Sequence, residues 1–350
     1  MTEPSSESFY CFSPPILRHS LEEQAGLHVF ETIRAFIELL EDLERRQSSG
    51  VQKPCFMTEL LASKEANFTR EEIAFIAVTL LEAGSDTTRN TLLEVVAGAA
   101  MYPDWIARAR AELDKVCGEN AQRLPTFDDM ERLPMIRAAV KEAIRWRYAS
   151  SHVTIPYTTS KPNVTITLFR PTNTQTGVPH ALTKDDEFEG YRLPAGTVVT
   201  WNHWGISHDP DEYDQPERFY PDRFLNDDLG KVTKGHLGFG AGKAFPFPPS
   251  SREIVFSVGA VTDHTNNFFV GRRVCVGFNV AASNLFIAIA RLVYCFDIEQ
   301  DPAHPVVVDK PFPLTAMEEP YKVIIKPRSE EHRKLVLNDC RDAAVIDPNA

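Results

Sequence analysis

The stretch Gly271-Arg-Arg-Val-Cys-Val-Gly277 surrounds a single cysteine with the features of a metal-binding thiolate. Two arginines lie just upstream of Cys275, and an apolar helical segment over residues 278–296 follows it directly. Nearby cations and a helix N-terminus both favour the deprotonated form of a thiol, which is the form that binds metals. The stretch therefore predicts a thiolate ligand at Cys275, although a cysteine near arginines is also the pattern of a buried, inert thiol.

Four further motifs precede this stretch, and each of them is common when it stands alone. In chain order they are Ala83-Gly-Ser-Asp-Thr-Thr88, Glu142-Ala-Ile-Arg145, Pro221-Asp-Arg-Phe224 and Phe239-Gly-Ala-Gly242. Their combination in this order is highly specific.

On these motifs the chain resembles the cytochrome P450 haem-thiolate monooxygenases, most closely the fungal, membrane-bound, reductase-dependent members. The haem-binding loop of that family reads Phe-x-x-Gly-x-Arg-x-Cys-x-Gly, and here its two halves are Phe239–Gly242 and Arg272–Gly277. The resemblance extends over roughly residues 28–328. It implies a mainly α fold with a small β region, namely the C-terminal, haem-side portion of the cytochrome P450 fold.

The resemblance also implies roles for individual residues. Cys275 would be the axial ligand of the iron of haem b, and Arg273 would reach a haem propionate, with Phe239, Gly242 and Gly277 completing the loop. The two catalytic residues would be Asp86 and Thr87, which in the family steady iron-bound dioxygen and relay protons. A buried ionic cluster with a structural role would comprise Glu142, Arg145 and Arg223.

The implied reaction is the insertion of one oxygen atom from O2 into a small organic substrate, in fungal secondary metabolism. Electrons would come from NADPH through the flavoprotein NADPH-cytochrome P450 reductase, docked near Lys231, Lys234, Arg272 and Arg273. The implied place of the full-length family is the cytosolic face of the endoplasmic reticulum membrane. The alternative is a truncated or misread product that binds no haem and catalyses nothing.

Composition and charge exclude several other classes of protein. The chain has 350 residues with a formal net charge of -12, which argues against a nucleic-acid partner because phosphate binding needs a basic face. Its six cysteines form no Cys-x-x-Cys pair, so neither a zinc site nor a disulfide framework is expected. No early apolar run approaches the ~20 residues that span a bilayer, so we expect this chain, as written, to be cytoplasmic.

Hydrophobic periodicity and capping signals predict the main elements. Helices are expected over residues 27–46, 69–102, 103–116, 134–148 and 278–296. A hairpin is expected between strands 191–193 and 197–200, with further strands at 306–308 and 321–325. Residues 1–26 and 329–350 are expected to be tails, with the chain unpacked from Pro327, which leaves 27–328 as a partial domain.

The predicted helix over residues 69–102 contains an interior glycine, Gly84, which suggests a specific role at this position. Gly84 costs about 1 kcal/mol relative to alanine in a helix interior. Ala83 and Thr87 lie four residues apart and therefore share a face with Gly84, which gives a shallow polar groove suited to close approach of a ligand. A helix-packing notch with a back-bonded threonine would give the same pattern.

Two stretches interrupt the family pattern. Residues 243–271 separate the two halves of the haem loop and contain five phenylalanines, and residues 153–175 contain seven threonines and no acidic residue. Boundary codons compatible with splice sites suggest that both are introns read through in a gene model, whereas the alternative is genuine surface insertions, which loops tolerate. We expect residues 243–271 to part the loop, and cDNA joining Gly242 to Arg272 would support the intron hypothesis.

Overall fold

The computed structural model describes residues 34–50, 55–62, 68–147, 180–188, 190–199, 203–240, 274–308 and 321–340. Both predicted insertions and the predicted N-terminal tail lie outside these residues. The chain divides into two compact units, one formed by Met1–Ser85 with Val153–Phe169 and the other by Asp86–His152 with Arg170–Ala350.

The first unit is helical in its described part. It contains helical residues 34–48, α2 (Phe56–Ala62) and the first half of α3 (Arg70–Met101), around a small core of Leu40, Leu43, Ile73 and Ala74. A capping box starts α3, because the Thr69 N–H donates to Glu72 Oε2 at 2.7 Å and the Glu72 N–H donates to Thr69 Oγ1 at 3.2 Å. The predicted start and length of this long helix are confirmed.

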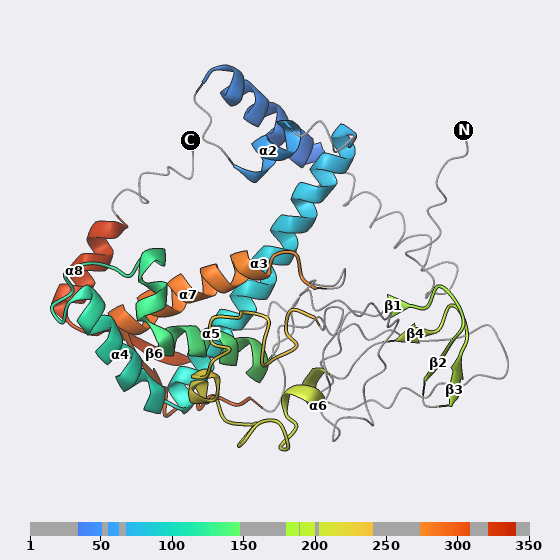
Figure 1. The fold of residues 1–350 in the computed structure, drawn as a ribbon. Helices are drawn as coiled ribbons and strands as arrows, with labels where there is room; N and C mark the ends of the chain where they lie inside the picture. The colour runs from blue at the N-terminus through green and yellow to red at the C-terminus, as the bar shows by residue number, and fades with distance from the viewer. Residues whose placement is uncertain are drawn as a thin grey trace. The chain divides into compact units, whose positions relative to one another are not determined.

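The second unit packs α4 (Asp104–Cys117) and α7 (Phe278–Cys295) against α5 (Pro134–Trp146), as Figure 1 shows. Eleven of the 13 residues of α5 are buried, including three charged ones, so this helix lies at the centre of the core. Both α4 and α5 begin where proline was expected to open a helix, and Gly118, at φ 93°, ends α4. The predicted helices over 103–116, 134–148 and 278–296 are thus confirmed to within two residues.

The β structure consists of three antiparallel pairs. They are β1 (His180–Ala181) with β4 (Val198–Val199), β2 (Asp186–Phe188) with β3 (Tyr191–Leu193), and β5 (Phe296–Gln300) with β6 (Val323–Pro327). The predicted hairpin between 191–193 and 197–200 is wrong. The chain reverses before β3, where Phe188 pairs with Tyr191 and Gly190 has a φ of 82°, so β3 pairs with the strand that precedes it and β4 with β1.

The C-terminal region differs most from expectation. Residues 306–308 are not a strand, and the chain beyond Pro327 forms helix α8 (Glu330–Asp339) instead of remaining unpacked. Ser329 caps α8 by accepting a hydrogen bond from the His332 N–H at 3.3 Å, and the buried His332 ring lies 4.8 Å from the ring of Tyr294. Arg328 also donates to Asp114 of α4 at 2.6 Å. The charged sequence after Pro327 had suggested an unpacked tail, but one of its charges attaches this end of the chain to α4.

Short helices complete the second unit. They are η1 (Phe127–Arg132), α6 (His203–Ser207) and η2 (Pro221–Phe224). Within the described residues, one helix, α7, is long and apolar enough to cross a membrane by length and composition. Its Leu285, Ile289 and Val293 are nevertheless buried in the core against α4 and α5, as in a helix at the centre of a folded domain.

Candidate haem-side site

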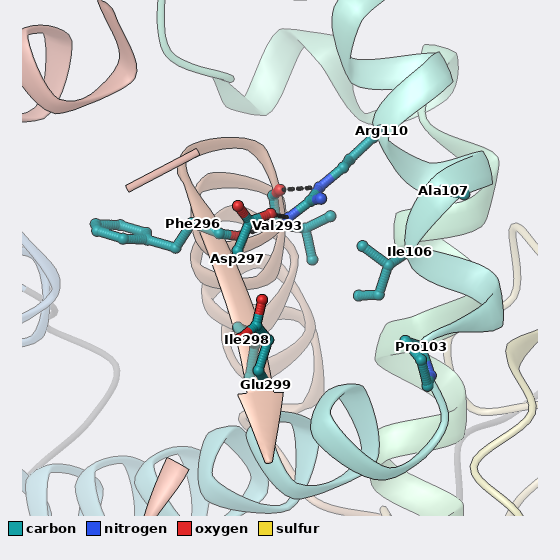
Figure 2. Close-up of a pocket in the computed structure, with 9 residues that line it drawn as sticks. All are labelled: Pro103, Ile106, Ala107, Arg110, Val293, Phe296, Asp297, Ile298 and Glu299. Atoms are coloured by element: carbon teal, nitrogen blue, oxygen red, sulfur yellow. Dashed lines mark hydrogen bonds and ion pairs between the residues drawn. The ribbon is translucent and has the colours of Figure 1, made fainter. Parts of the chain in front are cut away.

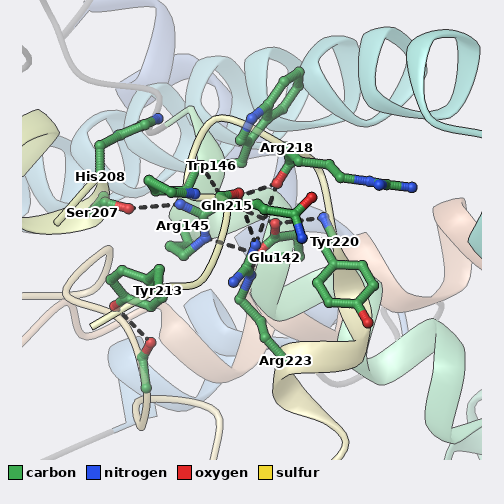
Figure 3. A network of polar contacts seen from close by, with 12 residues as sticks. Glu142, Arg145, Trp146, Ser207, His208, Tyr213, Gln215, Arg218, Tyr220 and Arg223 are labelled. Atoms are coloured by element: carbon green, nitrogen blue, oxygen red, sulfur yellow. Dashed lines mark hydrogen bonds and ion pairs between the residues drawn. The ribbon is translucent and has the colours of Figure 1, made fainter. Parts of the chain in front are cut away.

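A buried ionic cluster lies between the C-terminal half of α5 and the segment that contains η2 (Figure 3). Arg145 Nε lies 2.7 Å from Glu142 Oε2 with both side chains fully buried, and Arg223 Nε lies 3.2 Å from the same oxygen. The Tyr220 N–H donates to the other carboxylate oxygen of Glu142 at 2.7 Å. The structure therefore brings together the three residues expected to form a structural cluster, at a position where loss of one charged partner is costly.

The two arginines extend this cluster into the backbone that follows α6. Arg145 donates to the carbonyl oxygens of Ser207 at 2.6 Å and Pro216 at 3.0 Å, and Arg223 donates to that of Asp214 at 2.8 Å. The Trp146 indole N–H adds a hydrogen bond of 2.7 Å to the Glu217 carbonyl oxygen. Side chains of α5 and η2 in this way satisfy the backbone of an irregular segment that lacks strand or helix partners.

Burial around the cluster shifts the pKa of its neighbours. Desolvation lowers the pKa of His203 and of His208 to about 3, and the positive charge of Arg145 adds to both shifts. Desolvation also raises the pKa of the Tyr213 hydroxyl to about 12. Both histidines are neutral at pH 7, so the charge of the cluster is confined to the carboxylate and the guanidinium groups.

The two halves of the divided loop meet at their backbones. The Cys275 N–H donates to the Phe239 carbonyl oxygen at 2.9 Å, although 35 positions separate these residues in the sequence. The expectation that residues 243–271 would part Phe239 from Cys275 is therefore wrong for this contact. Gly277 caps α7, so Cys275 lies two residues before the helix cap.

The first half of the loop rests on α5. A Cβ atom on Gly238 would lie 2.1 Å from Ile144 Cγ2, so only glycine allows this close approach. The Phe239 ring is buried, 6.2 Å from that of Phe278 at the start of α7 and 5.8 Å from that of His236. The same helix that carries Glu142 and Arg145 therefore also supports the backbone against which Cys275 is held.

The side chain of Cys275 is exposed and forms no disulfide. Val276, the next residue, and Val280, in the first turn of α7, are 88% and 66% exposed, so aliphatic side chains close to Cys275 in the sequence face solvent. A thiol donor whose backbone is fixed, beside exposed aliphatic side chains, fits a large apolar macrocycle that needs one axial sulfur ligand. Of the other loop residues, Gly242 and Arg273 lie outside the described residues.

The residues expected to be catalytic lie next to each other near the middle of α3. Asp86 Oδ1 is 3.4 Å from Arg89 Nη2, and the Thr87 carbonyl oxygen accepts a hydrogen bond from Thr91 Oγ1 at 2.8 Å. Both side chains are half-buried. Apart from its chain neighbours and the backbone of its own helix, no described residue comes within 4 Å of where a Cβ atom of Gly84 would be, so this glycine faces open space among the described residues.

The surface expected to receive a reductase is described only in part. Lys231 forms an ion pair of 2.6 Å with Asp228, and its backbone carbonyl oxygen accepts a hydrogen bond of 3.1 Å from Lys141. Burial lowers the pKa of Lys141 to about 8. Arg272 and Arg273 lie outside the described residues. Of the four basic residues expected on this surface, the described ones are therefore Lys231 and Lys234.

One described pocket, of about 280 Å³, is separate from all the expected site residues (Figure 2). It lies between the start of α4 and β5, with Ile106 and Ile298 among its apolar walls. Arg110 occupies one side, where it donates to the Phe296 carbonyl oxygen and contacts Asp297, both at 2.7 Å. Because Arg110 is paired with Asp297, and Glu299 with Lys326, this pocket presents an apolar recess rather than a reactive centre.

Comparison with known proteins identifies the family. A family model described as Cytochrome P450 matches residues 5–166 and 168–245. The chain belongs to the cytochrome P450 family. This P450 chain is 35% identical to the P450 monooxygenase fsoB of Humicola fuscoatra, covering 83% of this chain and 47% of that protein. It is 30% identical to the P450 monooxygenase atE of Aspergillus terreus, covering 89% of this chain and 50% of that protein.

The chain spans about half the length of the curated P450 relatives it matches, as the 47% and 50% coverages state. Solved structures agree with the family. A zebrafish cytochrome P450 with progesterone has a TM-score of 0.58 and 26% identity, covering 84% of this chain and 57% of that one. A zebrafish cytochrome P450 with abiraterone has a TM-score of 0.53 and 26% identity, covering 76% of this chain and 51% of that one.

The predicted fold class is confirmed, because the described residues are mostly helical with small strand pairs and the structural neighbours are P450s. The relatives place it in a family of oxidoreductases whose members generally use haem iron. Sequence reasoning missed several buried charges of this P450, among them Glu94 and Arg147. The signal for Glu94 was present, since it is the sole charged residue between Thr91 and Met101, and an isolated carboxylate in an apolar helix needs a buried partner.

Proposed function

We propose that this chain is the haem-side portion of a haem-thiolate monooxygenase with Cys275 as the iron ligand. The observation that carries the proposal is the 2.9 Å hydrogen bond from the Cys275 N–H to the Phe239 carbonyl oxygen, because it joins the two halves of the loop. Haem bound through a thiolate supplies the iron chemistry by which one atom of O2 enters an organic substrate while the other becomes water.

The chain's own residues would support that chemistry in separate ways. Cys275 Sγ would bind the iron, and Arg273 would balance the charge of a haem propionate. The hydroxyl of Thr87 and the carboxylate of Asp86 would hold and relay a proton on the oxygen side of the site, because two adjacent groups on one helix can pass a proton in turn. Glu142, Arg145 and Arg223 fix the segment that leads to Phe239.

The proposal includes a redox partner and a cellular location. Electrons come from NADPH through NADPH-cytochrome P450 reductase, which docks on the surface that carries Lys231 and Lys234. The substrate is a small organic molecule of fungal secondary metabolism, as suggested by relatives that are fungal P450 monooxygenases. The complete protein acts at the cytosolic face of the endoplasmic reticulum membrane.

A second candidate is a non-catalytic product that binds no haem. Residues 243–271 lie between two halves of a motif that is continuous in the family, and this sequence observation favours it. The two candidates differ in one measurable property, the thiolate-type Soret band that a ferrous haem-thiolate gives with carbon monoxide.

The test compares the chain as written with a version in which Gly242 is joined directly to Arg272. Each is reconstituted with haem, reduced and exposed to carbon monoxide. We expect a thiolate-type band from at least one of the two versions, and we expect Cys275→Ser to abolish it. The matched controls are Cys117→Ser and Cys295→Ser, which change buried cysteines and should keep the band. No band from either version would favour the non-catalytic product, and a band that survives Cys275→Ser would exclude this cysteine as the ligand.

A further inference from the structure

A second buried charge network lies in the same unit and takes no part in the proposed chemistry. The Arg147 Nε atom lies 2.9 Å from Glu94 Oε2, with side chains 2% and 3% exposed. The Tyr321 hydroxyl lies 3.2 Å from each carboxylate oxygen of Glu94 and donates to it. Three distant segments, α3, the end of α5 and the strand region before β6, therefore meet at one carboxylate.

The network is closed by further contacts of Arg147. Its Nη1 donates to the Val308 carbonyl oxygen, and its guanidinium lies 5.9 Å from the centroids of the Trp146 and Trp204 rings. Burial and the adjacent carboxylate raise the pKa of Tyr321, so its hydroxyl remains a proton donor through the physiological range. A planar guanidinium that is stacked and bonded on several sides has little freedom to turn.

Glu94 lies on α3 seven residues after Thr87. Seven residues are close to two helical turns, so the two side chains point within about 20° of the same direction and lie about 10 Å apart along the axis. Between them Thr91 donates to the Thr87 carbonyl oxygen at 2.8 Å. Holding the Glu94 carboxylate in place therefore fixes both the rotation and the axial position of the turn that carries Asp86 and Thr87.

We propose that Glu94, Arg147 and Tyr321 are positioning residues that set the rotation of α3 and thereby aim Thr87 and Asp86 at the reacting oxygen. This inference rests on the proposed function. A purely apolar contact would bury the same helix face, but it would allow α3 to slide or rotate, whereas a paired buried charge specifies one register.

The first measurement needs no haem. Hydrogen exchange is followed for peptides covering residues 86–94 in the whole chain and in Glu94→Gln, which keeps the shape of the side chain but removes its charge. We expect exchange in this segment to become about tenfold faster because a buried pair has been broken. The control is Glu71→Gln, an exposed position in the first turn of the same helix, which should leave exchange in the segment unchanged.

The second measurement uses the haem-loaded protein with the reductase and NADPH. Two-electron reduction of O2 yields one H2O2 per NADPH oxidised, whereas four-electron reduction yields two waters for two NADPH, so the peroxide yield reports proton delivery without a known substrate. We expect Glu94→Gln to raise this yield toward that of Thr87→Ala, and to add nothing in the Thr87→Ala background. Arg147→Lys, which keeps the charge, should lie between the wild type and Glu94→Gln.

The outcomes separate the two proposals. Faster exchange with a peroxide effect that depends on Thr87 supports positioning. Equal effects of Glu94→Gln in both backgrounds would overturn it, since a role in stability alone acts without Thr87. If no version gives a thiolate-type band, the proposed function fails, and unchanged exchange over residues 86–94 would then overturn the register role as well, while faster exchange would retain it for α3.

Discussion

The same four-residue pattern, Glu-x-x-Arg, occurs in α5 and in α8 with opposite environments. In α5 the Glu142–Arg145 pair is fully buried with an N–O distance of 2.7 Å. In α8 the Glu330–Arg333 pair is 55% and 54% exposed, with a distance of 3.1 Å. Spacing brings the charges together in both helices, but only burial makes the pair part of the fold. The pattern alone therefore says nothing about importance, and its surroundings decide.

The largest difference should appear when the arginine of each pair is removed. Arg145→Met would leave the buried Glu142 with Arg223 as its remaining charged partner and orphan the carbonyl oxygens of Ser207 and Pro216. We expect a loss of about 3–5 kcal/mol in the free energy of unfolding, measured by denaturant titration. A loss below about 1 kcal/mol would mean that the cluster relaxes and that its burial does not matter to stability.

The surroundings of the buried Glu142–Arg145 pair also predict how the stability of the protein responds to acid. His208 beside the buried cluster has a folded pKa of about 3 against an ordinary value of 6.5. Below pH 6.5 His208 becomes protonated in the unfolded chain but stays neutral in the folded chain. The free energy of unfolding therefore falls as the pH drops toward 3. At pH 5 this amounts to about 2 kcal/mol for one histidine.

His208→Phe tests that value, because phenylalanine can keep the stack on Trp204, whose centroid lies 3.6 Å from that of the histidine. The variant should lose about 2 kcal/mol less than the wild type between pH 7 and pH 5. Parallel curves for wild type and His208→Phe would show that the buried histidine does not resist protonation.

Local signals explain which parts of the fold were predictable. The start of α3 was predicted because Thr69 and Glu72 satisfy each other's backbone within one turn. Likewise Pro134 opens α5 by itself. By contrast, the β5–β6 pairing joins Phe296 to Pro327, which are far apart in the sequence. The residues of neither strand indicate which strand it pairs with. The helix α8 was missed because the partner of its buried His332 is Tyr294 of α7, a contact that the charged sequence of α8 does not indicate.

The candidate site divides in the same way. Glu142 and Arg145 could be paired from their spacing, and family resemblance added Arg223. The meeting of Phe239 with Cys275 could not be derived, since the residues between them hide their proximity. Glu94 and Arg147 belong to different helices, so only the folded chain reveals that they share a pair. Contacts within one helical turn are visible in a sequence, whereas contacts between elements require the fold.

A smaller effect is expected at the start of α8. Ser329 Oγ accepts from the His332 N–H at 3.3 Å and lies 2.8 Å from Glu331 Oε2, to which it donates. Ser329→Ala removes the cap and should lower the free energy of unfolding by about 1 kcal/mol. Ser329→Thr retains both the hydroxyl acceptor and the donor to Glu331, so it should recover most of the loss, as checked by thermal unfolding. Equal destabilisation by both variants would indicate that packing of His332, and not the cap, holds this helix end.

The smallest effect should come from Arg333, the exposed arginine that occupies the same position in the second Glu-x-x-Arg pattern as Arg145 does in the first. Arg333→Met removes the second Glu-x-x-Arg pair, whose charges are both more than half exposed. Water and salt screen such a pair, so the free energy of unfolding should change by no more than about 0.5 kcal/mol, and 1 M salt should shrink even that change. Methionine is used here as in Arg145→Met, so the two variants differ only in environment. If Arg333→Met instead cost as much as Arg145→Met, α8 would have to be buried in the folded protein, and identical spacing would mean identical importance after all.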